Sequence, residues 1–255
     1  MLGFKLDALA RESLPLERDI GSADASIPGH FYMNETWPGS QFPVRNQQQC
    51  GSCWAFGAAE SFASRVFIAS NGTHANPLSV EQLVDCNLLG LEGCSGGDPA
   101  TASAYISLKG LVSEACYPYT AGNGKGGHCQ HSCTNTTAPN TWSPIKGKLS
   151  TIKWSLGEKA MQERIMAGGG IEVCFSVYSD FMAYAGGVYT KSSSATYEGG
   201  HCVMAEGWGV QNDTPYWLVR NSWGTSWGID GYFLIRRGTD ECGIEREAFS
   251  IDPQL

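Results

Sequence analysis

The sequence predicts an α+β fold in two parts: a mainly helical domain over residues 27–142, and a β-rich domain over residues 143–255. Helix-like runs of apolar residues dominate the first part until about residue 110, and strand-like runs dominate from about Trp142 onward, with one more helix among them. The 255 residues are enough for one large domain or two small ones. We expect a functional cleft between the two parts, because sites for long ligands favour such boundaries.

The helical part is organised around one stretch, which reads Gln47-Gln-Gln-Cys-Gly-Ser-Cys-Trp-Ala-Phe56. Apolar residues from Cys53 to Phe67 predict a helix that stops at Asn71-Gly72. Cys53 would begin this helix, where the backbone N–H groups and the macrodipole favour a thiolate and therefore a nucleophile. The pair Cys50 and Cys53 also fits a redox motif, half of a zinc site, or one arm of a disulfide network, and this stretch alone leaves those alternatives open.

The remaining elements follow from caps and periodicity. Ser79 and Gln82 form a capping box that opens a short helix ending near Cys86, and a second helix is predicted over residues 100–109. In the second part, a helix over residues 158–166 ends in three glycines. Alternating residues then predict a half-buried strand over 171–178. Further strands are predicted over residues 203–208, 216–219 and 232–235.

Charge and cysteine content point to a compartment. The net charge of −8 and the absence of a basic run argue against nucleic acid as a partner. Ten cysteines indicate an oxidising environment, and sequons at Asn34, Asn71, Asn135 and Asn212 agree with it. No apolar run approaches the ~20 residues of a membrane span. These features predict an oxidising vesicular compartment, or secretion.

Three motifs in one order resemble papain and the cathepsins: Cys50-Gly-Ser-Cys53-Trp, then Gly-Gly-His201-Cys, then Asn221-Ser-Trp223-Gly. The resemblance covers nearly all of the chain from Ile27 onward. The long interval between Cys53 and Asn221 favours the cathepsin B branch over papain itself. It implies a papain-like fold, with a helical left domain and a β-barrel-like right domain on either side of the active-site cleft.

The resemblance also implies a cysteine endopeptidase and gives each catalytic residue a role. Cys53 would be the nucleophile, His201 its general base and acid, and Asn221 the residue that orients the imidazole, with Trp223 shielding that contact. Gln47, six residues before Cys53, would hold the oxyanion together with the Cys53 N–H. No metal or organic cofactor is required.

Residues of the substrate cleft are implied in the same way. Gly96 and Gly97 would line its non-primed side, and Pro99 would wall the pocket for the second residue before the scissile bond. Asp98 either caps the following helix or adds charge to that pocket. The further pocket residues by resemblance are Cys174 and Cys202, with Glu247 at the floor, where a carboxylate would favour arginine while hydrophobic residues are also tolerated.

The family pattern implies disulfides Cys50–Cys94, Cys86–Cys129 and Cys116–Cys133, with Cys53 and Cys242 free. Cys174 and Cys202 should lie on neighbouring strands, either bonded or as two small apolar fillers, and we favour the fillers. Cathepsin B carries a long insertion with two adjacent histidines that bind a substrate's C-terminus. Here twelve residues separate Cys116 from Cys129, and only His128 and His131 flank Cys129. The sequence therefore predicts no occluding loop, an open cleft and little carboxydipeptidase activity.

Residues 1–26 resemble the tail of a cathepsin B propeptide, with Leu2-Gly3 near its Leu-Gly element and Ile27-Pro28 near the mature start. No leader precedes this tail, which predicts a truncated gene model.

The predicted partners are protein and peptide substrates, the chain's own propeptide and cystatin-type inhibitors, with the enzyme a monomer. Two alternatives are a papain-fold protein that binds without cutting, and a transpeptidase on the same scaffold. A redox protein would need both Cys50 and Cys53 free, which the pairing with Cys94 opposes.

Overall fold

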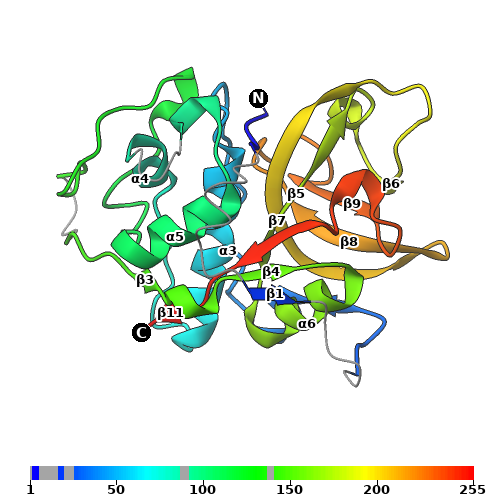
Figure 1. The fold of residues 1–255 in the computed structure, drawn as a ribbon, viewed down its shortest axis with the longest axis horizontal. Helices are drawn as coiled ribbons and strands as arrows, with labels where there is room; N and C mark the ends of the chain where they lie inside the picture. The colour runs from blue at the N-terminus through cyan, green and yellow to red at the C-terminus, as the bar shows by residue number, and fades with distance from the viewer. Residues whose placement is uncertain (1, 6–16, 20–25, 87–91, 137–140) are drawn as a thin grey trace.

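The computed structural model of the chain describes residues 2–5, 17–19, 26–86, 92–136 and 141–255. Helices α4 and α5 lie on one side and a large curved sheet on the other, with α3 between them and α6 below the sheet (Figure 1). This is the mixed α+β arrangement that the sequence predicts. The position of the boundary near residue 142 stays a prediction.

The helices begin and end where their caps predict. The central helix α3, Cys53–Ala69, stops before Asn71 and Gly72, both of which adopt positive φ. The side chain of Ser79 accepts a hydrogen bond from the Gln82 N–H at the start of α4, Val80–Asp85. The predicted capping box is only half formed, because the Gln82 side chain instead bonds the backbone of Gly110 and Val112. The other helices are α2 Met33–Thr36, α5 Pro99–Lys109 and α6 Glu158–Gly168.

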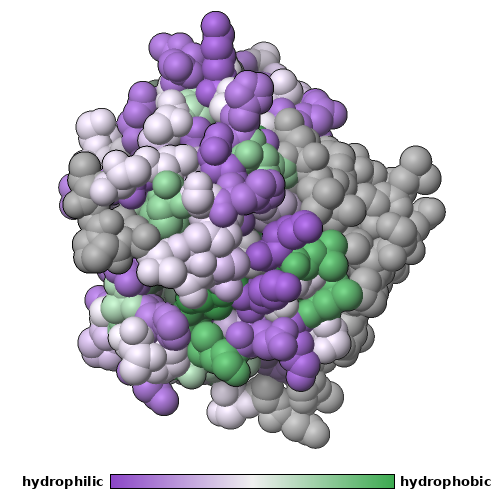
Figure 2. All heavy atoms as spheres, turned by 90° about the vertical axis from the view of Figure 1, so that its left-hand side faces the viewer, coloured by the Kyte–Doolittle hydropathy of each residue, from purple (hydrophilic) through white to green (hydrophobic). Residues whose placement is uncertain are grey.

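Short 3-10 turns link these elements: η1 Gly93–Ser95, η2 Ala121–Asn123, η3 Leu149–Thr151, η4 Phe181–Ala183 and η5 Glu241–Gly243. In the part of the chain that is described, no helix is both long and apolar enough to cross a membrane. Over the helical face, hydrophilic side chains predominate and hydrophobic ones form small separate groups (Figure 2).

The described strands form one large sheet in the order β1-β4-β10-β5-β7-β8-β9-β6, with β2 added at β7, and a small sheet of β3 and β11. Long antiparallel pairings join β5, Ile171–Tyr178, to β7, Tyr197–Gln211, and β7 to β8, Thr214–Arg220. The remaining strands are β1 Glu17–Asp19, β2 Phe31–Tyr32, β3 Lys146–Gly147, β4 Lys153–Ser155, β6 Val188–Tyr189, β9 Tyr232–Arg236, β10 Glu247–Ser250 and β11 Pro253–Gln254.

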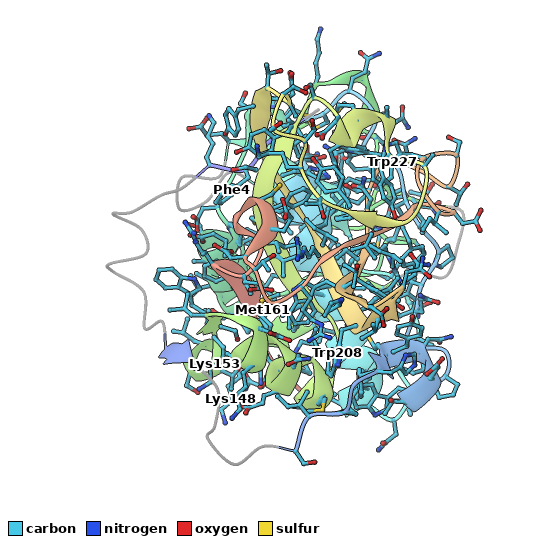
Figure 3. The ribbon with its side chains drawn as sticks, turned by 90° about the vertical axis from the view of Figure 1, so that its right-hand side faces the viewer. Phe4, Lys148, Lys153, Met161, Trp208 and Trp227 are labelled. Atoms are coloured by element: carbon cyan, nitrogen blue, oxygen red, sulfur yellow. A yellow bond between two sulfur atoms is a disulfide. The ribbon has the colours of Figure 1, made fainter. Side chains whose placement is uncertain are left out.

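Strand β5 departs from the predicted half-buried pattern. Its first five residues are all buried, including Glu172 and Cys174 on the face expected to be polar. The reason is that α3 packs on this face: a Cβ added at Gly57 would lie 2.9 Å from the Glu172 side chain. The sheet therefore has a core on each face. One contains α3 residues such as Trp54 and Phe62, and the other contains Trp208, Trp217 and Phe233. Met161 of α6 and Trp208 belong to the second core (Figure 3).

The three predicted disulfides Cys50–Cys94, Cys86–Cys129 and Cys116–Cys133 are confirmed, and Cys53 and Cys242 are free. The preference for unbonded fillers at Cys174 and Cys202 is wrong, because these two form a fourth disulfide. They lie directly opposite each other on β5 and β7, so their side chains leave the sheet on the same face.

Candidate active site

Cys53 is the first residue of α3 and is fully buried. The turn before it is fixed by the Cys50–Cys94 disulfide and by a 3.0 Å hydrogen bond from the Gly51 N–H to the Cys94 carbonyl. The carbonyl of Ser52 accepts from the N–H of Phe56, which starts the helix. A free thiol is thereby held at a helix N-terminus, as the sequence predicts.

His201, Asn221 and Trp223 form a connected group at the neighbouring edge of the sheet. Nε2 of His201 lies 2.8 Å from Oδ1 of Asn221. The same oxygen accepts the Ser222 N–H, so it is the oxygen of the amide, and Nε2 must carry the hydrogen. The imidazole stacks 4.8 Å from the ring of Trp223. Nδ1 of His201 is buried and has no hydrogen-bond partner among the described residues, so its lone pair remains available to a thiol.

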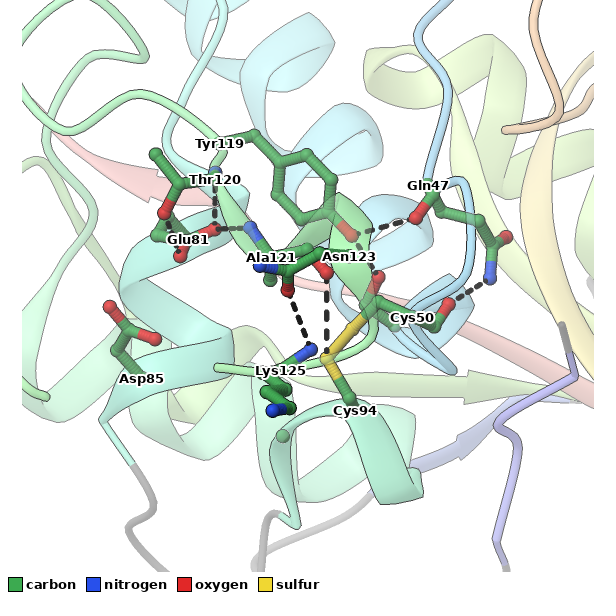
Figure 4. Close-up of a disulfide and its surroundings, with 12 residues drawn as sticks. Gln47, Cys50, Glu81, Asp85, Cys94, Tyr119, Thr120, Ala121, Asn123 and Lys125 are labelled. Atoms are coloured by element: carbon green, nitrogen blue, oxygen red, sulfur yellow. Dashed lines mark hydrogen bonds between the residues drawn. A yellow bond between two sulfur atoms is a disulfide. The ribbon is translucent and has the colours of Figure 1, made fainter. Parts of the chain in front are cut away.

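Gln47 is buried beside this group. Its Nε2 donates to the Cys50 carbonyl over 2.8 Å, and its Oε1 accepts from Oγ of Ser222 over 2.7 Å (Figure 4 shows the first contact). The Gln47 side chain is therefore held at both its nitrogen and its oxygen. Ser222 follows Asn221 directly, so one short segment holds both the oxyanion candidate and the orienting residue.

Backbone pairing fixes the two sides of the site to each other. The Gln47 N–H donates to the Ser222 carbonyl over 2.8 Å, and the Gly224 N–H donates to the Arg45 carbonyl over 3.1 Å. Asn46 forms an isolated bridge with Trp223 between these two bonds. The loop before α3 and the loop after β8 therefore pair through their backbones. This pairing holds the part of the chain that carries Cys53 against the part that carries Asn221.

Residues 2–5 lie across this site. The Phe4 N–H donates to the Gly200 carbonyl over 3.2 Å, and Lys5 and Gly3 bond Gly97 through the Lys5 N–H and the Gly3 carbonyl. Phe4 thus pairs in parallel with Gly97 and reaches β7 on its other side. Lys5 adds an exposed ion pair with Glu92. The segment bridges both walls of the site and covers Cys53.

Burial under this segment controls the charge of Cys53 and His201. It raises the pKa of the Cys53 thiol to about 11, although backbone N–H groups of Cys202 and Gly3 act in the opposite direction; the nearby Glu172 carboxylate raises that pKa further. Burial also lowers the pKa of His201 to about 3, against the effect of Asn221. The predicted low-pKa thiolate is therefore wrong for the covered site, where thiol and imidazole are both neutral.

The predicted substrate residues gather around the same place. Gly97 packs so closely that an added Cβ would lie 2.5 Å from the indole of Trp54, and Gly96 has positive φ. Asp98 is buried and its Oδ1 accepts the N–H groups of Ala100 and Thr101, so its observed role is the helix cap, directly before Pro99. Glu247 on β10 lies directly opposite Cys174 on β5, which is bonded to Cys202 on β7.

Acidic residues that the sequence did not single out shape the surroundings. Glu81 of α4 accepts hydrogen bonds from the N–H and hydroxyl of Thr120 and from the N–H of Ala121 (Figure 4). Asp85, one helical turn on, accepts from the Gly127 N–H and the Tyr117 hydroxyl. The only sequence signal for these two residues is their spacing of four on a predicted helix, which places them on one face. That spacing does not predict which groups they bind.

Among the described residues, Glu172, Cys174 and Cys202 form a group within 4.8 Å that has the composition of a metal site. The two sulfur atoms are joined in a disulfide and offer no thiolate, so this group does not suit a metal.

Comparison with known proteins gives one answer. The model of the papain family cysteine protease domain matches residues 33–251. Cathepsin B-like cysteine proteinase 5 of Caenorhabditis elegans is 38% identical, across 94% of this chain and 79% of that protein. Cathepsin B-like cysteine proteinase 6 of the same organism is 36% identical, across 98% and 72%. The solved structure of proCathepsin B S9 from Trypanosoma congolense superposes with a TM-score of 0.88 at 31% identity, covering 100% of this chain and 87% of that one.

Proposed function

Because the chain belongs to the papain family of cysteine proteases and is cathepsin B-like, we propose that it is an endopeptidase that cuts peptide bonds through a thioester intermediate. The observation that carries this proposal is the free, buried Cys53 at the start of α3, together with the hydrogen bond between His201 on β7 and Asn221 in the loop after β8. All the groups that the reaction needs are therefore present in one place.

In the uncovered site, the proton of Cys53 passes to Nδ1 of His201, and the thiolate adds to the scissile carbonyl carbon. The carbonyl oxygen takes the displaced electron pair and is held by the Cys53 N–H and a Gln47 amide N–H. His201 then gives its proton to the leaving amine as the C–N bond breaks. Water, deprotonated by His201, attacks the thioester, and the acid product leaves with Cys53 restored.

The covered state requires an activation step. Residues 2–5 occupy the place where substrate would lie, and both catalytic groups are neutral beneath them. We infer that residues 1–26 are the tail of an inhibitory propeptide and that Ile27 lies near the mature start. Release of the segment would admit water, let the thiolate–imidazolium pair form, and free the cleft.

Substrate selection rests on the pocket beside Gly97. Gly96 and Gly97 would admit an extended backbone, and we propose that Pro99 forms a wall and that Glu247, which is opposite Cys174 in the strand register, stands at the far side. We propose that this pocket takes the second residue before the scissile bond, accepting hydrophobic residues and, through Glu247, arginine.

The short segment between Cys116 and Cys133 supports endopeptidase action. Its disulfide closes a span of 17 residues, and Glu81 and Asp85 hold its glycine-rich part on α4. Such a tied segment has little length left to fold over the cleft. We therefore propose that the cleft is open at both ends, without an occluding loop, and that carboxydipeptidase activity is low.

The disulfides and the proposed activity also bear on the compartment in which the enzyme acts and on what binds it. Four disulfides fit an oxidising compartment, so we propose a lysosome-like or secreted enzyme that acts on proteins and peptides. We further propose a monomer that cystatin-type inhibitors bind.

An internally quenched peptide with a blocked C-terminus tests the endopeptidase proposal against a peptide of the same sequence with a free C-terminus. The processed enzyme should cut both at similar rates within the chain. Release of C-terminal dipeptides from the free peptide alone would contradict an open cleft. Products joined to an added amine in place of water would establish the transpeptidase.

A further inference from the structure

The Cys174–Cys202 disulfide is the feature of the site that the catalytic reaction does not use. Both cysteines are fully buried and belong to the core that also contains Cys53 and Trp54. Cys202 directly follows His201, and its N–H acts on the Cys53 sulfur. The disulfide therefore lies at the centre of the site, on the sheet face that α3 covers.

Strand register places the disulfide between the catalytic residues and Glu247. Cys202 on β7 is opposite Cys174 on β5, and Cys174 is opposite Glu247 on β10. Paired residues project from the same face, and neighbouring strands lie ~4.8 Å apart. The three residues form a row across three strands, in which Cys202 and Cys174 lie side by side and the Glu247 carboxylate stands at the far end beyond them.

The side chain of Phe4 lies beside this row of residues. The Phe4 N–H bonds the carbonyl of Gly200, which shares a face of β7 with Cys202. A Cβ added to Gly200 would lie 2.8 Å from Cδ1 of Phe4, and Phe4 packs against the core that contains both cysteines. Phe4 is labelled in Figure 3, near the covered end of the sheet. The surface beside the disulfide thus holds an aromatic ring.

We propose that the Cys174–Cys202 disulfide is a specificity-determining element that makes this pocket favour an aromatic residue over arginine. The inference rests on the proposed function, because it treats the pocket as one for substrate. Disulfide sulfur is polarizable and contacts aromatic rings favourably. The two bonded sulfur atoms also fill the row that an arginine side chain must cross to reach Glu247. The carboxylate therefore contributes less to arginine binding than it would if two small residues stood at positions 174 and 202.

The first test uses the full chain and needs no catalysis. Opening of residues 2–5 is followed as the rate at which iodoacetamide alkylates Cys53, with the site identified by mass spectrometry. Phe4→Arg should speed alkylation by roughly two- to tenfold more than Phe4→Tyr does, because the aromatic contact with sulfur is lost. Equal rates for the arginine and tyrosine variants would overturn the proposal, and these variants leave every cysteine in place.

The same assay measures coupling between Phe4 and the disulfide. Phe4→Ala is compared in the unaltered chain and in a Cys174→Ala/Cys202→Ala background, with Cys116→Ala/Cys133→Ala as a matched disulfide control. The Phe4→Ala effect should shrink only when Cys174 and Cys202 are replaced. An effect of the same size in all three backgrounds would overturn the inference.

The second test uses the processed enzyme and two fluorogenic substrates, one ending Phe-Arg and one ending Arg-Arg. Because both carry Arg before the cleaved bond, any change in His201 positioning affects both and cancels in the ratio of kcat/KM. Cys174→Ala/Cys202→Ala should shift the ratio towards Arg-Arg by roughly two- to tenfold, and adding Glu247→Gln should reverse that shift. An unchanged ratio would contradict the proposal. Absence of cleavage by folded enzyme would refute the proposed function and the substrate preference with it, whereas an intact Phe4 coupling would still establish the contact between Phe4 and the disulfide.

Discussion

Replacing Gly3 with alanine should uncover the active site in the full chain. A Cβ at this position would lie 1.9 Å from the carbonyl oxygen of Gly51, a distance that no real contact reaches. The alanine Cβ is fixed by its own backbone and the Gly51 oxygen is a backbone atom, so no side-chain rotation can relieve the overlap. The segment that carries Gly3 must therefore move.

Hydrogen bonds account for part of what opposes that movement, beside the packing of Phe4 and the Lys5–Glu92 ion pair. Three backbone hydrogen bonds hold residues 3–5 to Gly97 and Gly200, and each contributes about 0.5–1.5 kcal/mol, or about 1.5–4.5 kcal/mol together. Once uncovered, Cys53 loses the burial that raises its pKa to about 11. A cysteine at a helix N-terminus beside an imidazolium titrates at ~3.5–7.5. At pH 7 the covered thiol is ionised in about one molecule in ten thousand, whereas most uncovered molecules carry the thiolate.

Thiolate absorbance near 240 nm, followed from pH 5 to pH 8 in a Cys242→Ala background, measures this difference. Gly3→Ala should show about one thiolate per chain at pH 7, and the unaltered segment should show almost none. Gly29→Ala is the control, since a Cβ there meets nothing within 4 Å. A Gly3→Ala titration that matches the Gly29→Ala titration would refute the account of the covered site.

Three further substitutions test single contacts in the processed enzyme. Asn221→Ala leaves the Nε2–H of His201 buried without its acceptor, so kcat should fall by roughly 10- to 100-fold with KM little changed; an unaltered kcat would show that the amide does not orient the ring. Gln47→Ala removes the proposed oxyanion donor and should lower kcat by about 10²–10³-fold in enzyme that is still folded at the assay temperature, although its melting temperature should fall because the buried Cys50 carbonyl and Ser222 hydroxyl each lose a hydrogen bond; a loss confined to KM would assign Gln47 to substrate binding instead. Asp98→Ala removes the cap of α5 and should cost about 0.5–2 kcal/mol in urea unfolding while the ratio of Phe-Arg to Arg-Arg cleavage stays constant; a changed ratio would place its carboxylate in the pocket.

The sequence predicted helix ends correctly where they depend on interactions between neighbouring residues. The helix stop at Asn71-Gly72 and the Asp98 cap depend on residues within a few positions, and both hold in the structure. Three disulfides and the His201–Asn221 contact also agree, but these came from resemblance to a family, because sequence alone does not fix which distant residues meet.

The failures all involve packing between distant segments. Glu172 and Cys174 were expected on a polar face, and nothing in β5 itself shows that α3 lies against that face. The Cys174–Cys202 bond depends on strand register, which periodicity does not supply. The raised pKa of Cys53 depends on the cover formed by residues 2–5, while the helix-start argument considers only the helix.

The assignment of Cys53 as the nucleophile is tested most directly by exchanging one free cysteine at a time. Hydrolysis of the Phe-Arg substrate is measured for the processed enzyme and for its Cys53→Ala and Cys242→Ala variants, each shown to be folded by its melting temperature. Cys53→Ala should abolish hydrolysis, and Cys242→Ala should retain it, because Cys242 lies in η5 outside the site. Hydrolysis that survives in Cys53→Ala would contradict the central claim.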